Sequence, residues 1–392
     1  MGESRTKNYP YLEDGGSTIT LAEDSATVSE FTSQVSEKER ELALRLLGEA
    51  PAISLHDHPT RLPDPLTAEA WQEFRSSGRP YHGFEGLRRS GMSAVFVNAW
   101  SFAPPEQVIQ FLSRLRADVA HHDGFFIAET AADLGRTTGG GGADGIGFYL
   151  SLESATAFAN QPQAFEELYG LGLRMAGLCY NDGNAFGDGL GAGDGDGGLT
   201  RAGQDLVRTF NDLGIVLDLG HVGDQTALDT IAVSKVPVVV SHAGARAIWD
   251  TPRMKDDRLL HALAGSGGVI GISAAPNTTR SRNNPNHSIE SFMDHLFYCV
   301  EQMGIDHVAL GPDTMFGDHA GIHQLGRGDG QWGQHSGREQ GDLVSFVDGV
   351  ENPSENFVNV AVYLHRKNWS DAEIKKILSG NARRVLQQVF VR

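Results

Sequence analysis

The chain alternates short apolar, strand-like runs with helix-like segments over most of its 392 residues, and this alternation constrains the fold more than any other feature. The strand-like runs occupy residues 53–58, 93–99, 125–129, 146–153, 173–180, 215–221, 237–242, 269–273 and 307–313. Repeated strand–helix–strand units pair their strands in parallel through right-handed crossovers. The sequence therefore predicts an α/β protein built on one parallel sheet, which is either closed into a barrel or open.

Two observations decide between the closed and the open sheet. No G-x-G-x-x-G motif follows the first strand-like run, which counts against an open dinucleotide-binding sheet. A (β/α)8 barrel needs one strand fewer than the chain offers, and the short run 125–129 is the natural surplus. We therefore predict a (β/α)8 TIM-type barrel with extra N-terminal and C-terminal segments, and we place run 125–129 outside the barrel.

The N-terminal residues differ in composition from the rest of the chain. Residues 1–35 are polar, with clustered Ser, Thr, Asp and Gly, and we interpret them as an N-terminal arm. A first helix is predicted to begin at Ser36, which forms a capping box with Glu39. We therefore divide the chain into a polar arm, residues 1–35, and a single barrel domain, residues 36–392.

Charge and cysteine content exclude several classes of protein. The 32 basic and 50 acidic residues give a formal charge of −18, which disfavours nucleic acids and anionic membranes as partners. Cys179 and Cys299 both fall inside predicted regular elements, so no disulfide framework is expected. We find no signal-like apolar core at the N-terminus and no apolar run as long as a membrane span, and we expect a cytoplasmic location.

Several strand-like runs end on side chains that can bind a metal ion. His56 and His58 are two residues apart on one run, so their side chains point to the same face of the strand. Four later runs also end on such a residue, and these residues are Glu153, His221, His242 and Asp313. Each of them alone has an ordinary explanation as a capping or rim residue. Together they occupy equivalent positions at the C-terminal ends of barrel strands, where the chemistry of this fold is carried out.

The number and type of these side chains predict the metal. Imidazole and carboxylate ligands suit Zn²⁺ or another borderline divalent cation. Six ligands are too many for one tetrahedral catalytic site that also keeps a water molecule. We therefore expect two Zn²⁺ ions, with Glu153 able to bridge them through its two oxygens.

Longer motifs around these residues resemble those of the membrane (renal) dipeptidase family of binuclear zinc metallopeptidases, within the amidohydrolase superfamily. The motifs that carry the resemblance are His56-Asp57-His58-Pro59, 148–153 (FYLSLE), 198–200 (GLT), 218–222 (DLGHV), 240–243 (VSHA), 252–257 (PRMKDD), 310–313 (LGPD) and 380–386 (GNARRVL). They span most of the predicted barrel and the C-terminal helices.

The resemblance implies roles for individual residues. It makes His56, His58, Glu153, His221 and His242 metal ligands and places Asp313 beside the metals, where it binds them or handles the proton. It also implies that Arg253 receives a substrate carboxylate, a role that suits a planar guanidinium. A homodimer is a further implication.

Two positions depart from the family pattern. The first strand carries His-x-His where the family usually has His-x-Asp. After the strand at residues 173–180 the chain has Tyr180 where the family places a histidine that polarises the scissile carbonyl. A phenol is a neutral hydrogen-bond donor that can hold an oxyanion but cannot carry the charge of an imidazolium. Tyr180 is therefore either a catalytic and substrate-binding residue or a packing residue at the barrel mouth.

From these features we expect a metal-dependent dipeptidase that cleaves the amide bond of a dipeptide or dipeptide-like small molecule with a free carboxylate. One alternative is an amidohydrolase that acts on a non-peptide small amide or an N-acyl amino acid. Another is a catalytically silent barrel protein that only binds a ligand. The segment Gly321–Gly349 receives no assignment from the sequence.

Overall fold

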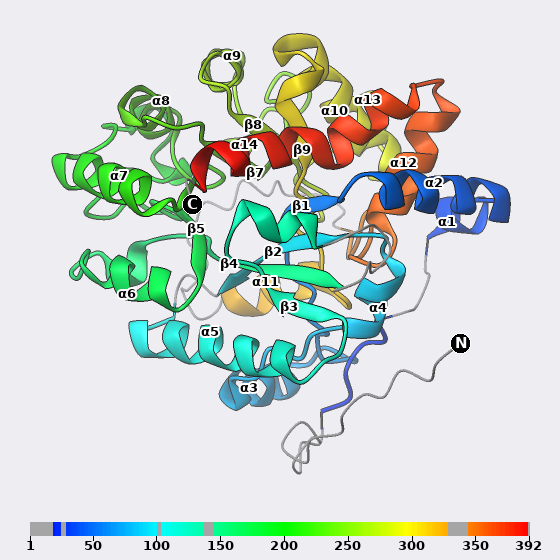
Figure 1. Ribbon diagram of the computed structural model, residues 1–392, viewed down its shortest axis with the longest axis horizontal. Helices are drawn as coiled ribbons and strands as arrows, with labels where there is room; N and C mark the ends of the chain where they lie inside the picture. Colours follow the sequence, from blue (N-terminus) through cyan, green and yellow to red (C-terminus); the bar gives the residue numbers. More distant parts are fainter. Residues whose placement is uncertain (1–18, 25–28, 100–102, 137–144, 328–343, 391–392) are drawn as a thin grey trace.

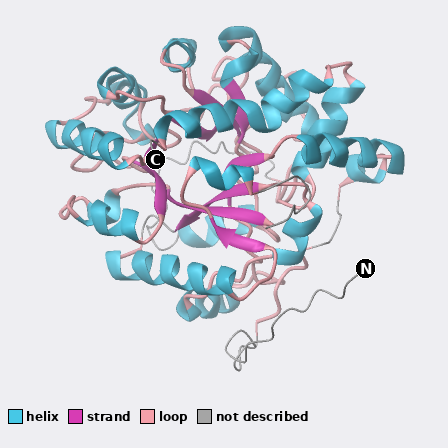
Figure 2. Cartoon of the chain, in the orientation of Figure 1, coloured by secondary structure: helices cyan, strands magenta, loops and turns pink. Residues whose placement is uncertain are grey.

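The computed structural model describes residues 19–24, 29–99, 103–136, 145–327 and 344–390. Nine parallel strands lie in one sheet (Figures 1 and 2), and they are β1 (Ile53–Asp57), β2 (Ala94–Ala99), β3 (Phe125–Ile127), β4 (Ile146–Leu152), β5 (Leu173–Gly177), β6 (Val216–Asp218), β7 (Val239–Ala243), β8 (Val269–Ile272) and β9 (Val308–Leu310). The pairs β9–β1 and β2–β4 close eight of these strands into a ring. The predicted (β/α)8 barrel with extra segments is confirmed.

Strand β3 is the surplus strand that the sequence places outside the barrel. It pairs with β4 only over Ile146–Phe148, whereas β5 pairs with β4 further along, over Leu150–Leu152. Because β2 occupies the other edge of β4 from Gly147 onward, β3 must lie on the β5 side. It therefore fills the part of that edge that β5 does not reach.

Helices surround the barrel as an outer layer (Figure 1). The α-helices are α1 (Glu30–Ser33), α2 (Glu37–Glu49), α3 (Ala68–Ser77), α4 (Phe84–Arg89), α5 (Pro105–Ala120), α6 (Ala164–Gly170), α7 (Arg201–Leu213), α8 (Asp224–Val233), α9 (Asp257–Gly265), α10 (Ile289–Met303), α11 (His319–Arg327), α12 (Asn356–Arg366), α13 (Asp371–Lys375) and α14 (Asn381–Val389). Short 3-10 helices occur at Ala131–Gly135, Thr156–Phe158, Leu190–Gly195 and Ile305–His307, and the π-helical turn Lys376–Gly380 joins α13 to α14. The predicted capping box of Ser36 and Glu39 begins α2.

The barrel interior is closed at one end by the C-terminal helix α14. Side chains from the first residues of the strands, such as Ile53 and Val269, cluster with Val385, Leu386 and Val389 of α14. Asn381 anchors this helix by donating to the carbonyls of Ile305 and Val308, each at 2.7 Å. Helix α14 therefore covers the N-terminal ends of the strands, the end opposite the predicted site.

The described part of the N-terminal arm packs against the barrel. The Ala22 amide donates to the Leu62 carbonyl at 2.8 Å, and Phe31 of α1 is buried in the main core. In the C-terminal part of the chain, Asp348 forms a parallel β-bridge with Ser288. This bridge holds the residues that follow position 343 beside the start of α10. Cys179 and Cys299 are buried free thiols. Among the described helices, none has the length and apolar character that crossing a bilayer requires.

Candidate metal centre

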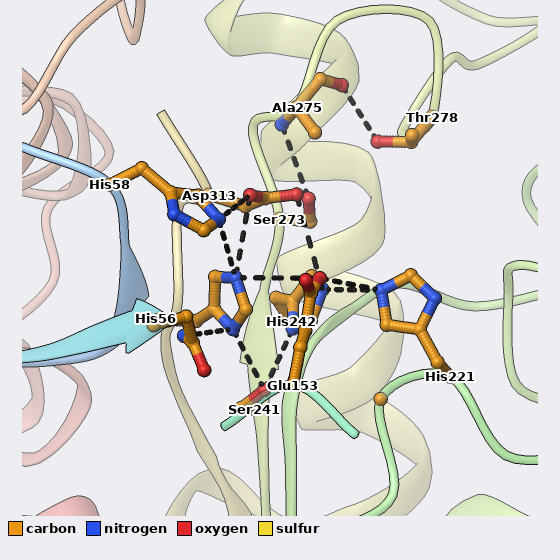
Figure 3. Close-up of polar contacts among 12 residues, drawn as sticks. His56, His58, Glu153, His221, Ser241, His242, Ser273, Ala275, Thr278 and Asp313 are labelled. Atoms are coloured by element: carbon orange, nitrogen blue, oxygen red, sulfur yellow. Dashed lines mark hydrogen bonds and ion pairs between the residues drawn. The ribbon is translucent and has the colours of Figure 1, made fainter. Parts of the chain in front are cut away.

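Six predicted ligands converge at the C-terminal mouth of the barrel (Figure 3). We call His56, His58, Glu153, His221, His242 and Asp313 the six-residue cluster. His56 and His242 lie within β1 and β7, while His58 and Glu153 directly follow β1 and β4. The sequence had placed His221 at the end of a strand, but β6 stops at Asp218 and His221 lies in the loop beyond it. Tyr180 likewise lies beyond β5, which ends at Gly177.

Glu153 is the residue that connects the two halves of the cluster. Its Oε1 lies 3.0 Å from His221 Nε2, 3.6 Å from His242 Nε2 and 3.9 Å from His56 Nε2. Glu153 is a member of two groups of three residues whose ligand atoms lie close enough together to hold a metal ion. One group is His56, His58 and Glu153, and the other is Glu153, His221 and His242. The carboxylate of Glu153 therefore belongs to both groups.

Asp313 lies beside the first group. Its Oδ1 is 3.4 Å from His58 Nε2 and 3.5 Å from His56 Nε2, and its Oδ2 is 4.0 Å from His242 Nε2. The backbone of Asp313 has a φ of 58°, a left-handed conformation that is uncommon for residues other than glycine. Its amide donates to the His56 carbonyl at 2.9 Å, so the two segments hold each other in register.

The strand alternation expected at residues 56–58 explains how this register is secured. Asp57 points away from the metal-facing side and accepts hydrogen bonds from the Thr314 amide and hydroxyl, both at 2.8 Å, and from the Ser54 hydroxyl at 2.9 Å. Thr314 follows Asp313 directly. One buried carboxylate of β1 thus fixes the loop that carries Asp313.

Burial controls the protonation of the cluster. It lowers the pKa values of His56, His221 and His242, so these imidazoles are neutral and can act as ligands. Burial also raises the pKa of Glu153 to about 8. Although burial opposes its ionisation too, hydrogen bonds from His56 and His58 hold the pKa of Asp313 well below its usual range.

These donors fit a divalent cation on chemical grounds. Four imidazoles and two carboxylates meet at the barrel mouth, and four of the six residues are buried. A cation there would offset the cost of ionising Glu153. Imidazole nitrogens and carboxylate oxygens suit zinc or a similar borderline ion, and such a site does not need cysteine thiolates. The residues present therefore suit the metal that the family resemblance implies.

Arg253 and Tyr180 lie beside the cluster. Arg253 is buried and donates from Nη1 to the Gly220 carbonyl at 2.7 Å, and burial lowers its pKa while the charges of Asp313 and Glu153 oppose that effect. The ring of Tyr180 stacks on the imidazole of His221 with centroids 4.0 Å apart. Arg253 thus contacts the residue before His221, and Tyr180 contacts His221 itself.

Sequence reasoning missed several polar residues around the site. Asn181 Oδ1 lies 2.8 Å from His221 Nδ1, and Asn98 Nδ2 lies 2.9 Å from His56 Nδ1. Lys255 is completely buried, with Nζ donating to the Val222 carbonyl at 3.2 Å, and burial lowers its pKa to about 7. Position within the quoted motifs could have drawn attention to Lys255, but the identity of its partner could not be read from the sequence.

Comparison with known proteins identifies the family. The family model described as membrane dipeptidase (peptidase family M19) matches residues 87–328. The dipeptidase ataJ of Aspergillus terreus is 28% identical over 304 residues, which cover 72% of this chain and 67% of that protein. A Klebsiella pneumoniae protein described as uncharacterized, from the region 5′ of pqqA, is 30% identical over 57% of this chain and 86% of its own length.

Solved structures agree in fold. An amidohydrolase from Pseudomonas aeruginosa superposes with a TM-score of 0.75 at 22% identity, covering 89% of this chain and 99% of that one. A metallopeptidase from Rhodobacter sphaeroides, liganded with a phosphinate mimic of the dipeptide L-Ala-D-Ala, superposes with a TM-score of 0.65 at 20% identity, covering 87% and 99%. With a family model that matches more than half of its length, the chain belongs to the membrane dipeptidase family, peptidase family M19.

Proposed function

We propose that this protein is a binuclear zinc-dependent hydrolase that cleaves the amide bond of a dipeptide or dipeptide-like molecule with a free carboxylate. The observation that carries the proposal is the position of Glu153, whose Oε1 belongs to two metal-capable groups at once. All members of the six-residue cluster serve as ligands in this proposal, with Asp313 also available for proton transfer.

Each residue has a defined task in the reaction. Bound zinc would supply Lewis-acid polarisation of the carbonyl and an activated water. Asp313 accepts the proton of the attacking water and returns it to the leaving amine, a role for which its low pKa leaves it ionised at the start. Arg253 binds the substrate carboxylate through parallel hydrogen bonds, and Tyr180 donates its phenolic proton to the developing oxyanion.

The related proteins support a dipeptide as the substrate class. The Aspergillus terreus relative is described as a dipeptidase, and the Rhodobacter sphaeroides metallopeptidase was solved with a dipeptide mimic. A buried arginine next to the cluster also suits a substrate that has a carboxylate near the bond to be cleaved.

Tyr180 favours a second candidate. Because a phenol stays neutral where the family has an imidazole, an N-acyl amino acid or another small amide is a competing substrate class. Tyr180 stacks on His221, so the phenol that replaces the family's histidine lies directly beside a proposed metal ligand.

One experiment tests the metal and the substrate together. We would strip the protein with a chelator, reload it with zinc, and measure bound metal by elemental analysis, expecting about two equivalents from the ligand number. The loaded enzyme would then be offered L,L- and L,D-dipeptides, their C-terminal amides and N-acetyl amino acids. Turnover confined to N-acyl amino acids would remove the dipeptidase proposal. If the zinc-loaded protein turned over none of these substrates, a catalytically silent binding protein would be favoured. Full activity without any divalent metal would refute the whole proposal.

A further inference from the structure

A single hydroxyl group lies behind two of the proposed ligands. Ser241 Oγ is 2.7 Å from His242 Nδ1, 3.4 Å from His56 Nδ1 and 2.6 Å from Asp218 Oδ2 (Figure 3 shows the contacts to the two histidines). His56, Ser241 and His242 are fully buried, and Asp218 is only 1% exposed. Water therefore does not compete for these hydrogen bonds, and their directions can be worked out from the donors and acceptors alone.

The direction of each hydrogen bond follows from Asp218. Its Oδ1 accepts from the backbone amides of Gly220 at 2.9 Å and Ser241 at 2.8 Å, so the carboxylate is held as an acceptor. A serine hydroxyl has one proton to donate, and here that proton goes to Asp218 Oδ2. A lone pair of Ser241 Oγ then faces His242 Nδ1 at 2.7 Å, and a nitrogen that bonds to a lone pair must carry a proton.

This reasoning fixes the tautomer of His242. Its Nδ1 is protonated and donates to Ser241, so Nε2 presents a lone pair toward Glu153. The same hydroxyl does not fix His56, because its contact to His56 Nδ1 is longer, at 3.4 Å, and the Asn98 amide donates from Nδ2 to that nitrogen at 2.9 Å. The effect of Ser241 should consequently be larger on His242 than on His56.

Asp218 could instead be regarded as a ligand, because His56, Asp218 and His242 together have the spacing of a cation site. Its hydrogen bonds argue otherwise. Both oxygens already accept, from two amides and one hydroxyl, whereas the close contacts described for Glu153 Oε1 are to the imidazole nitrogens of His56, His221 and His242. Asp218 is therefore placed to orient the serine rather than to bind the metal.

The backbone around Ser241 leaves little room for this arrangement to relax. A Cβ atom on Gly271 would come within 2.1 Å of the Ser241 carbonyl oxygen, and one on Gly311 within 1.8 Å. Glycines of β8 and of the segment after β9 thus allow the Ser241 carbonyl of β7 to lie close to both segments. A change at position 241 should alter the hydrogen bonds before it moves the strand.

We propose that Asp218 and Ser241 are a positioning pair that holds His242 in the tautomer with a proton on Nδ1 and a free lone pair on Nε2. The pair orients this imidazole for a divalent cation, and only this last step rests on the proposed function. Partners of this kind typically change metal affinity when they are removed, without touching the metal themselves.

The first test is zinc affinity, measured by competition with a fluorescent chelator. Ser241→Ala should weaken zinc binding about 10- to 100-fold, the range typical of such outer contacts. Ser151→Ala is the matched control, because Ser151 is also fully buried on a barrel strand, two residues before Glu153, and its hydroxyl has no hydrogen-bond partner within the described chain. Equal zinc affinities of the two variants would overturn the proposal.

The second test reads the tautomer in metal-free protein, where turnover plays no part. In ¹⁵N-histidine NMR spectra, with the His242 signals identified from His242→Gln, wild type should show protonated Nδ1 and unprotonated Nε2. Ser241→Ala should change that signal, while Ser151→Ala should not. Unchanged nitrogen shifts in Ser241→Ala would also overturn the proposal.

These readouts separate the positioning pair from the proposed function. Protein that binds zinc but cleaves no dipeptide would refute the substrate, and a zinc-affinity loss in Ser241→Ala would still support the pair. If the wild-type protein bound no zinc, the proposed role of the pair in orienting a metal ligand would be refuted.

Discussion

The imidazole rings of His56 and His242 lie face to face across the barrel mouth, with centroids 3.5 Å apart and planes tilted by 32°. Strands β1 and β7 are not neighbours in the barrel, since β9 and β8 lie between them. Two protonated imidazoles would repel each other strongly at this distance, and burial already lowers both pKa values. Barrel closure therefore keeps these ligands in the neutral form that metals bind.

This arrangement predicts how the metal-free protein responds to acid. His56, His221 and His242 have folded-state pKa values below 6.5, so the unfolded chain binds more protons than the folded chain once the pH falls below 6.5. Their stabilising contribution is complete above pH 6.5 and decreases as the pH is lowered. Groups with raised pKa values, such as Glu153 and Glu351, act in the opposite direction in every variant, so the difference between variants carries the prediction. In thermal unfolding of chelator-treated protein at pH 7.5, 6.5 and 5.5, acid should lower the Tm of His242→Gln less than that of wild type. The exposed His365→Gln should keep the wild-type slope, and equal slopes for all three proteins would contradict the assignment.

Asp313→Asn should lower kcat by roughly 10²- to 10⁴-fold, the usual contribution of a general acid–base, with a smaller change in KM. Asparagine tolerates the left-handed φ of 58°, so the backbone should keep its conformation. Asp313→Ala removes the same carboxylate but adds backbone strain of about 1–2 kcal/mol, and its Tm should be the lower of the two. Steady-state kinetics and calorimetry measure both effects. A kcat for Asp313→Asn within threefold of wild type would rule out proton transfer by this residue.

Arg253→Lys should impair substrates with a free carboxylate selectively. Lysine keeps the positive charge but cannot form two parallel hydrogen bonds, and a lost charge-assisted hydrogen bond of about 1.5 kcal/mol corresponds to roughly a tenfold rise in KM. Dipeptides and their C-terminal amides would be compared in the same assay. The variant should lose its preference for the free acid, and an equal loss on both substrates would point to a structural role for the contact with Gly220.

Glu351→Gln should stabilise the protein at high pH and not at low pH. Glu351 is 7% exposed, and burial raises its pKa from 4.5 to about 7. The folded chain then binds its proton more tightly than the unfolded chain, so the contribution of Glu351 is most favourable below pH 4.5 and is lost as the pH rises through 7. The difference at pH 8 is on the order of 3 kcal/mol.

The Oε1 atom of glutamine can still accept a hydrogen bond from the Gly349 amide, and the side chain does not become charged. Calorimetry should give Glu351→Gln a higher Tm than wild type at pH 8 and a similar Tm at pH 5. The exposed Glu301→Gln is the control and should behave like wild type at both pH values. A gain of the same size at pH 5 and pH 8 would show that charge is not the cause.

Local patterns were sufficient for most elements and insufficient for a few. The capping box of Ser36 and Glu39 predicted the start of α2, because neighbouring residues alone determine this feature. Helix α3 was missed, although Thr67 caps it, because Trp71 and Phe74 pack against residues far away in sequence, such as Met315 and Ile322. The early ends of β5 and β6 were also missed, since strand ends depend on pairing with neighbours.

The sequence by itself determined the class of fold, the surplus strand and the identity of the side chains at the mouth, because alternation and strand-end position are local properties of the chain. Only the tertiary structure decided which atoms meet. The order of the strands around the closed barrel brings Glu153 within 3.0 Å of His221 and places Ser241 between His56 and His242. The physical reason is that hydrogen bonds and ion pairs depend on distances of a few tenths of an ångström, which are set by the packing of the whole barrel.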